Sequence, residues 1–420
     1  MKICIVGGGV KGINILAECI ANYPSCDIQL FEAKSAIGGI WTNDSNVPYM
    51  SIQMVPGHYR FPNYPPPRSR YAKDIQQYVH QYARDHNLYP YIHLNTTVLR
   101  VASDTDHQPP TVFFDTRPPM VYDYVVLTGL TTHKHVPSLY HNVPNVIHSS
   151  ELDAHTLRNI HANKLKCAVI GGSKSAADAI YNIGVDTHPV WVARKFYTYG
   201  RFNDRTTINP SQLLYCLPHV NNSKNFGRCI LPLKINDSDI PDHGSGNILT
   251  DDEYRVLRMV RTIKGNVVSV GNNMLSIKTD DGEMVHEPFD KIILGTGYRQ
   301  TNSIGHTLYN GKNRRVIDME RAQGKLLTTF GVIHSHVLAS AFVNYLGENN
   351  QSVDFSTYFD HFTRNRWYSL NMYQFHYMVM PNTSICPYNQ HARWTQRLTM
   401  YLILGTMIFI LVAHSYIYKP

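Results

Sequence analysis

Strand-like runs alternate with amphipathic stretches through the early part of the chain. Ile3–Val6 and Asp27–Phe31 predict two short strands, and Gly12–Asn22 between them predicts a helix. This order predicts a parallel sheet with crossover helices. Asp74–Asp85 carries apolar residues on one face and predicts an amphipathic helix, while Tyr122–Leu127 predicts another strand. The early part of the chain is therefore typical of an α/β domain.

A second strand–turn–helix pattern begins later in the chain. Cys167–Ile170 predicts a strand, a Gly- and Ser-rich turn follows, and a helix is predicted to about Ile183. Pro189–Ala193 and Lys291–Leu294 predict further strands, whereas residues 200–250 are rich in Asn, Asp, Ser, Pro and Gly and predict irregular loops. The sequence thus predicts two copies of one architecture rather than a short-period repeat.

The last hydrophobic stretch has a different pattern. Leu398–Tyr418 contains no Asp, Glu, Lys or Arg, and it reaches the roughly 20 residues that span a bilayer. Tyr401, Tyr416 and Tyr418 lie near its ends, as aromatic side chains do at membrane interfaces. We expect residues 398–418 to form a single-pass transmembrane tail anchor. The alternative is a buried core helix, which His414 favours.

Composition narrows the class of protein. The 420 residues are 43% hydrophobic and 17% charged, which excludes a disordered chain and allows about two or three domains. The net charge is +8, but the densest basic patch is Lys312–Arg315, so we expect no nucleic-acid partner. Seven Cys residues without paired spacing predict a reducing compartment. No H-E-x-x-H or C-x-x-C motif occurs, and we expect no metal site.

The first glycine turn predicts a dinucleotide site. Gly7–Gly12 fits G-x-G-x-x-G, follows a predicted strand and opens a predicted helix, as the motif requires. Gly7 allows the tight turn, Gly9 lets the backbone approach a pyrophosphate, and Gly12 lets the helix pack on the strand. The helix N-terminus then faces the phosphate charge. Glu32, at the end of the next strand, is placed to bind a ribose hydroxyl.

A second, relaxed turn predicts a second dinucleotide site. Residues 171–176 read Gly-Gly-Ser-Lys-Ser-Ala, so Ser173 replaces the middle glycine and Ala176 replaces the last one. Ala is tolerable at the last position, where only helix packing is required. Arg194 ends the following strand, where an NAD site would carry an acidic residue. A cation there suits a 2′-phosphate and indicates NADP, and Lys195 is placed to assist.

Several segments together resemble the flavin-containing monooxygenases. The resemblance rests on the glycine and tryptophan segment that follows Glu32, on the Lys-Ser-Ala form of the second turn, and on two Thr-Gly strand ends. In sequence these are Phe31-Glu32 with Gly38-Gly39-Ile40-Trp41, then Val169–Asp178, then Thr128-Gly129 and Gly295–Tyr298. It covers about residues 1–300, and it implies an FAD domain into which an NADP domain is inserted.

The resemblance assigns domains and site residues. It implies two doubly wound, Rossmann-like domains and a C-terminal hydrophobic helix: residues 1–145 begin the FAD domain, residues 146–285 form the NADP domain, and residues 286–395 return to the FAD domain and include the C-terminal region. The residues expected at FAD are Gly7, Gly9, Val10, Gly12, Glu32, Gly39, Ile40, Trp41, Thr128, Gly129 and Gly297. Those expected at NADP are Gly171, Ser173, Lys174, Ser175 and Arg194.

The resemblance also implies a reaction. NADPH would reduce FAD, O₂ would form a flavin C4a-hydroperoxide, and one oxygen atom would pass to a soft nitrogen or sulfur nucleophile of a small molecule. One alternative keeps the fold but makes the protein an NADPH oxidase or an oxygenase of carbonyls or carbon acids. Another is a catalytically degenerate, membrane-tethered flavoprotein. With the tail anchor, we expect a cytosolic catalytic domain on a membrane such as the endoplasmic reticulum.

Two departures from the family pattern bear on catalysis. Of the family's F-x-G-x-x-x-H-x-x-x-[FY] motif only His148 is present. The Asn that many members place beside the flavin has no counterpart, and its position falls on Gln53 or on Val55 depending on the register. Gln53 could donate an amide hydrogen bond to the flavin site and Val55 could not. We favour Gln53 as the catalytic residue.

Overall fold

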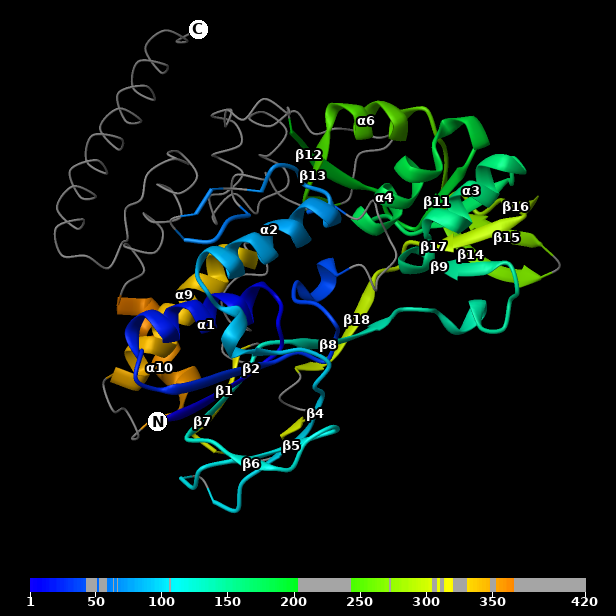
Figure 1. Cartoon of the computed structure of the whole chain (residues 1–420). Coiled ribbons are helices and arrows are strands. Elements are labelled where there is room, and N and C mark those ends of the chain that lie inside the picture. Colours follow the sequence, from blue (N-terminus) through cyan, green and yellow to red (C-terminus); the bar gives the residue numbers. More distant parts are fainter. Residues whose placement is uncertain are drawn as a thin grey trace, which may run out of the picture.

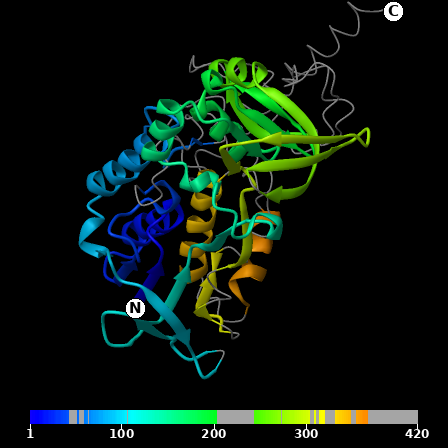
Figure 2. The same ribbon diagram turned by 90° about the vertical axis from the view of Figure 1, so that its right-hand side faces the viewer.

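Two α/β domains make up most of the described chain (Figure 1). The computed structural model describes residues 1–42, 51–52, 59–62, 64–65, 67–105, 107–202, 243–271, 273–303, 308–309, 313–319, 331–347 and 353–365. Figure 2 shows the same two bodies from the side, with the second domain, coloured green to yellow, above the first.

The first domain is built on a five-stranded parallel sheet. Its order is β19-β7-β1-β2-β3. The strands are β1 (Lys2–Val6), β2 (Asp27–Phe31), β3 (Ile92–His93), β7 (Tyr124–Leu127) and β19 (Val316–Asp318). Val6 pairs with Phe31 on one side and with Leu127 on the other, so three strand ends meet where the first glycine turn begins.

Helices cover this sheet and complete its core. They are α1 (Val10–Asn22), α2 (Ala72–Asp85), α9 (Gly331–Gly347) and α10 (Phe355–Asn365). Figure 1 shows α9 and α10 beside α1, and the Tyr23 hydroxyl donates to the Val343 carbonyl at 2.8 Å. Ile13, Leu30 and Phe342 are fully buried in the shared core. The last helices of the described chain therefore pack on the first, because burying their apolar faces removes them from water.

The second domain has a seven-stranded mixed sheet. Its order is β16-β15-β14-β11-β10-β17-β9, parallel from β14 to β9 and antiparallel through β14, β15 and β16. The strands are β9 (Val146–His148), β10 (Cys167–Ile170), β11 (Val190–Ala193), β14 (Arg261–Gly271), β15 (Met274–Thr279), β16 (Met284–Pro288) and β17 (Lys291–Leu294). The helices are α3 (Ala154–Ala162), α4 (Lys174–Ile183) and α6 (Asp251–Arg258).

Smaller elements join and extend the domains. The antiparallel strands β8 (Leu130–Lys134) and β18 (Tyr298–Ser303) carry the chain from one domain to the other and back. A second small sheet contains β4 (Val98–Ala102), β5 (Thr111–Phe114) and β6 (Met120–Val121), and a third pairs β12 (Tyr197–Phe202) with β13 (His243–Thr250). Short 3-10 turns span Gly39–Trp41, Tyr89–Tyr91, Ser138–Tyr140, Ser149–Glu151 and Val185–Thr187.

The predicted organisation is confirmed in its main lines and corrected at one boundary. Both strand–turn–helix units form, on two sheets, with the second domain inserted between β7 and β19 of the first. The boundary predicted after residue 285 is wrong, because it falls inside β16, and β17 still pairs with β10 and β9 of the second sheet. A short strand such as Lys291–Leu294 could belong to either parallel sheet. Its sequence alone therefore could not show on which side of the domain boundary it lies.

Two further expectations concern the later chain. Residues 200–250 were expected to be irregular, yet their described ends belong to β12 and β13. Residues 398–418 lie outside the described residues, so the expected tail anchor is not tested. Among the helices of the described chain, none has the length and apolar character needed to cross a bilayer.

Candidate functional site

The first glycine turn is forced by steric crowding at the end of β1. Gly7 has φ +105°, and a Cβ there would lie 2.7 Å from the Thr128 hydroxyl oxygen. A Cβ on Gly12 would lie only 1.9 Å from the Gly7 carbonyl oxygen. Both positions therefore require glycine, one for its backbone angle and one for the close approach of α1 to the strand end.

A second pair of glycines faces the turn. The Gly38 N–H donates to the Gly8 carbonyl at 2.9 Å, and a Cβ on Gly39 would lie 3.1 Å from the Gly9 Cα. Gly9 itself is the extended residue before α1, and its carbonyl accepts from the N–H of Ile13 at 3.0 Å. The two backbone segments thus lie against each other at the helix N-terminus, where backbone N–H groups favour a phosphate.

Glu32 lies between the turn and the end of β2. It is 7% exposed, its Oε2 accepts from the Gly8 N–H at 2.6 Å, and its Oε1 accepts from the Lys34 N–H at 2.9 Å. A carboxylate oxygen has a second lone pair, so each oxygen can also accept from a ribose hydroxyl. This fits the role that the motif predicts.

The other residues expected at FAD surround this turn. The Thr128 hydroxyl donates to the Val6 carbonyl at 2.7 Å, which ties the ends of β1 and β7 together, and Gly129 follows it. Trp41 is buried with its indole N–H donating to the Tyr59 hydroxyl at 2.5 Å, whereas the Ile40 side chain is 63% exposed. Val10 is the first residue of α1.

The second turn has the same backbone form and faces a cavity. Gly171 has φ +132°, and a Cβ there would lie 2.4 Å from the Gly295 carbonyl oxygen. The cavity has a volume of about 810 Å³ and lies at the ends of β10, β11 and β17. Its lining includes both glycines of the turn, Ser173, the pair Arg194-Lys195, and a stretch of β14, namely Gly265, Asn266 and Val267. Arg194, Lys195 and Ser173 are exposed to solvent.

Two of the residues expected at NADP do not line this cavity. Ser175 is the second residue of α4, and Lys174 is the first. The Lys174 side chain is 2% exposed, and its ammonium contacts Asp178, the Glu253 carboxylate at 3.1 Å and the Ser51 hydroxyl at 3.2 Å. The backbone of Lys174 therefore lies beside the cavity. Its ammonium group lies in the protein interior, because the carboxylates that neutralise it are buried there.

Burial and charge act against each other in this cluster. Burial disfavours the ionised form of Glu253, but Lys174 and Arg70 outweigh burial and leave its pKa below the usual value. For Asp178 burial prevails over the attraction of Lys174, and its pKa is raised. Sequence reasoning missed Arg70, Glu253 and Ser51, since only the fold brings them to Lys174.

His148 contacts the segment, just before β18, through which the chain returns from the second domain to the first. Its Nε2 lies 2.9 Å from the Gly297 carbonyl oxygen, and its Nδ1 lies 3.2 Å from the Ser150 nitrogen, so a neutral ring protonated at Nε2 satisfies both. Burial lowers its pKa. Gly297, expected at FAD, has φ +71° and also accepts from the His135 N–H at 3.0 Å. The carbonyl of Gly297 is thereby fixed at the junction of the domains.

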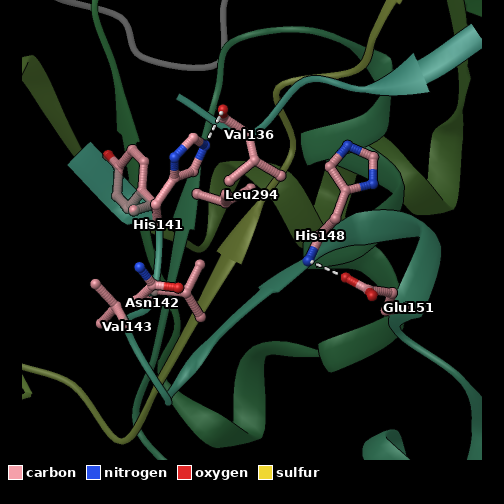
Figure 3. A pocket seen from close by; sticks show the side chains of 9 residues that line it. Val136, His141, Asn142, Val143, His148, Glu151 and Leu294 are labelled. Carbon is pink, nitrogen blue, oxygen red and sulfur yellow. Dashed lines mark hydrogen bonds between the residues drawn. The ribbon is translucent and has the colours of Figure 1, made fainter. Parts of the chain in front are cut away.

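A smaller cavity of about 330 Å³ lies beside His148 (Figure 3). Figure 3 shows the backbone N–H of His148 donating to the Glu151 carboxylate, a contact of 2.8 Å, and the His141 ring next to the Val136 carbonyl. The polar side chains His141, His148 and Glu151 of this cavity form hydrogen bonds with nearby backbone groups. Tyr140 lines both cavities. Gln53 and its alternative Val55 lie outside the described residues, so the catalytic assignment stays a prediction.

Comparison with known proteins agrees with this geometry. No family model matches the chain. An FAD-dependent monooxygenase of Alternaria brassicicola is 27% identical over 205 residues, which are 46% of this chain and 35% of that protein. An FAD-dependent monooxygenase of Pyrenophora dematioidea is 26% identical over 199 residues, 43% of this chain and 36% of that protein. The matches span about a third of the length of these curated relatives.

Solved structures share the fold at low identity. A flavin-containing monooxygenase from Stenotrophomonas maltophilia has a TM-score of 0.51 at 15% identity, over 74% of this chain and 81% of that one. An oxidized steroid monooxygenase bound to NADP has a TM-score of 0.56 at 14% identity, over 83% and 86%. A cyclohexanone monooxygenase has a TM-score of 0.56 at 13% identity, over 84% and 88%. Over part of its length the chain is similar to FAD-dependent monooxygenases, and it shares the fold of solved flavin-containing and steroid monooxygenases, in line with its motifs.

Proposed function

We propose that this protein is an FAD- and NADPH-dependent monooxygenase. The observation that carries the proposal is the presence of two glycine turns, each at the strand ends of its own parallel sheet and each opening a helix. Ligands of open α/β sheets bind outside the carboxyl ends of the strands, next to such turns. One dinucleotide per domain is therefore what the architecture can hold.

The first turn fits FAD. A side chain on Gly12 would collide with backbone, and the paired Gly9 and Gly39 leave only backbone beside the helix N-terminus. That cradle suits a pyrophosphate, and the Glu32 carboxylate next to it suits a ribose. Trp41 ends the short turn that begins at Gly39, and its ring packs on Tyr59.

The second turn and its cavity fit NADPH. The cavity of about 810 Å³ runs from the turn to the exposed cations Arg194 and Lys195. A guanidinium at the end of the strand after the turn suits a 2′-phosphate, which distinguishes NADPH from NADH. The residues that line this cavity would hold and orient the nucleotide. Neither role requires a side chain that acts as an acid or a base.

Bound FAD would supply the hard chemistry, accepting hydride from NADPH and activating O₂. The chain would bind and orient both cofactors and exclude water between its domains. Transfer of one oxygen atom to a soft nitrogen or sulfur nucleophile of a small molecule is part of the proposal. Gln53, if it faces the flavin, would donate an amide hydrogen bond there.

The test begins with the purified full-length protein. A flavin spectrum should appear or be restored by added FAD, NADPH should bleach it, and air should restore it. Isotopically labelled O₂ should then place one labelled atom in an amine or sulfide product. A protein that takes up no flavin contradicts the proposal. If the amount of H₂O₂ formed equals the amount of NADPH consumed with every nucleophile, the protein is an oxidase. Labelled oxygen in the product of a carbonyl substrate, with none in an amine or sulfide, would indicate an oxygenase of carbonyls.

We also propose that residues 398–418 attach the protein to a membrane, with the catalytic domains on the cytosolic side. The support is the uncharged sequence of that segment. The full chain should then resist alkaline carbonate extraction, and truncation after Arg397 should release a soluble, flavin-binding protein. Truncation that instead yields aggregates without flavin would indicate a core helix.

A further inference from the structure

A buried charged cluster links the two domains outside the crossing strands. It comprises Lys174 and Asp178 of α4, Glu253 of α6, and Arg70 with Ser51 from the first domain, and we call it the Lys174 cluster. Arg70, Lys174 and Glu253 are at most 4% exposed. Two cations and two carboxylates face one another, so the cluster can be electrically balanced.

Two contacts join the two sides: the buried ion pair of Arg70 with Glu253, at 3.1 Å, and the hydroxyl of Ser51. The Ser51 hydroxyl oxygen lies 3.2 Å from the Lys174 ammonium, 3.2 Å from the Arg70 guanidinium and 3.5 Å from the Asp178 carboxylate. Arg70 also donates to the Ile52 carbonyl at 3.1 Å, and the Ile52 N–H donates to the Arg70 carbonyl at 2.9 Å. The segment 51–52 is thus fixed both to its own domain and to α4.

Lys174 occupies a special place along the chain. It is the first residue of α4 and directly follows Ser173, which lines the large cavity. A cation in the first turn of a helix opposes the helix dipole, so its burial there depends on the carboxylates around it. Any shift of this turn on binding a nucleotide moves the base of the Lys174 side chain, and with it the contact to Ser51.

We propose that Lys174 is a positioning residue that couples nucleotide binding at the second turn to the placement of segment 51–52 of the first domain. The inference rests on the proposed function for the identity of the nucleotide. It also gives the lysine of the second motif a role other than phosphate binding. Segment 51–52 directly precedes Gln53, the residue expected at the flavin, so the coupling would reach the reaction site.

Ser51→Ala is the decisive variant. Lys174→Met would leave buried carboxylates without their cation and endanger folding. Ser51→Ala keeps every charge, leaves the Arg70–Glu253 ion pair in place and removes only the hydroxyl that joins Lys174 to the first domain. Ser276→Ala is the matched control, because Ser276 is 9% exposed and its hydroxyl contacts the His286 ring at 2.9 Å, within the β15–β16 hairpin.

The first measurement is hydrogen exchange of peptides that cover residues 51–52, on the full chain without nucleotide. We expect faster exchange in Ser51→Ala and no change in Ser276→Ala. The second adds NADP⁺. In the wild type, NADP⁺ should slow exchange at both 171–173 and 51–52. In Ser51→Ala the slowing at 171–173 should remain and the slowing at 51–52 should be smaller, because only the Arg70–Glu253 ion pair still links the segment to the second domain. The Kd for NADP⁺ should rise about 3- to 10-fold in Ser51→Ala, which corresponds to the net free energy of one or two hydrogen bonds.

The outcomes separate the inference from the proposed function. NADP⁺ protection of 171–173 without protection of 51–52 in the wild type overturns the coupling and leaves the proposed function intact. Equal exchange of 51–52 in Ser51→Ala and wild type overturns it as well. Absence of any NADP⁺ protection at 171–173 in the wild type overturns the proposed nucleotide, and the coupling with it.

Discussion

The glycine turns after β1 and after β10 have the same backbone form but exclude a side chain at different places. Val6 pairs with Leu127 in one sheet, and Ile170 pairs with Leu294 in the other, so Gly7 corresponds to Gly171 and Thr128 to Gly295. In the first unit a Cβ on the helix residue Gly12 would meet the Gly7 carbonyl oxygen of the turn itself. In the second unit a Cβ on Gly295, at the neighbouring strand end, would meet the helix.

The difference explains why a relaxed motif still folds. A Cβ on Gly295 would lie 2.5 Å from the Ala176 Cα, so Ala176 is accommodated because residue 295 has no side chain. In the first unit Thr128 occupies that place, and its hydroxyl bonds to the Val6 carbonyl. A small residue is thus required in the helix of the first unit and at the neighbouring strand end of the second, because the closest backbone contacts differ.

The largest effect is expected at the first turn. Gly12→Ala would place a Cβ 1.9 Å from the Gly7 carbonyl oxygen, and backbone cannot yield easily. We expect a loss of about 3 kcal/mol or more in the free energy of unfolding, with loss of bound flavin. Denaturant unfolding and flavin content measure both. The matched change in the second unit, Ala176→Gly, should cost only about 1 kcal/mol, the helix propensity difference. A tolerated Gly12→Ala would break the comparison.

The next effect should fall on the second unit alone. Gly295→Ala introduces a Cβ 2.5 Å from the backbone of Ala176, and we expect a cost of about 2–3 kcal/mol. The variant should keep flavin and lose affinity for NADP⁺, which calorimetric titration would measure. Equal loss of flavin would show that the two turns are not independent.

A smaller effect is expected at the exposed cation of the cavity. Arg194→Ala removes a charge-assisted contact to a 2′-phosphate, which costs about 1.5–3 kcal/mol. The preference for NADPH over NADH should therefore fall roughly 10- to 100-fold in the ratio of kcat/KM values. Lys278→Ala, which removes an exposed charge of β15 outside the cavity, is the control for loss of a surface charge. An unchanged ratio in Arg194→Ala would assign the selectivity to other residues.

The smallest effect concerns pH. Burial lowers the pKa of His148 in the folded protein below the value usual for histidine, so folding favours the neutral ring. Its contribution to stability is present above the unfolded pKa and is lost as pH falls through that value towards the folded one. The stability of the wild type should thus fall more steeply below about pH 6.5 than that of His148→Asn. Parallel curves would contradict this.

The sequence allowed much of the fold to be predicted, and the reasons are local. Strands such as Asp27–Phe31 and the turn at Gly7 follow from periodicity and glycine spacing. The sites of Gly7, Gly9, Gly12 and Glu32 follow from the same motif. Gly295 was read as part of a family segment, but its packing against α4 depends on the register of β17 with β10, which no local pattern encodes.

The Lys174 side chain illustrates the same limit within a motif. Its place in the Gly-Gly-Ser-Lys-Ser-Ala turn suggested a phosphate contact, and the structure directs the ammonium to Glu253 and Ser51. Both partners are far from Lys174 in the chain; Glu253 meets it within the second domain, and Ser51 meets it only when the two domains are together. A motif fixes where a backbone runs, whereas the direction of a long side chain depends on tertiary partners.

The pairing of β8 with β18 has a consequence for how the chain folds. Lys134 and Tyr298 are register partners, so the inserted domain leaves and returns at neighbouring points, where a hairpin loop would otherwise stand. Once that domain is compact, β7 and β19 are joined by a short effective connection, and the entropy lost in closing the first sheet is smaller. The second domain would then act as an early-folding nucleus for the first, and Gly295→Ala should slow the regain of flavin binding after dilution from denaturant.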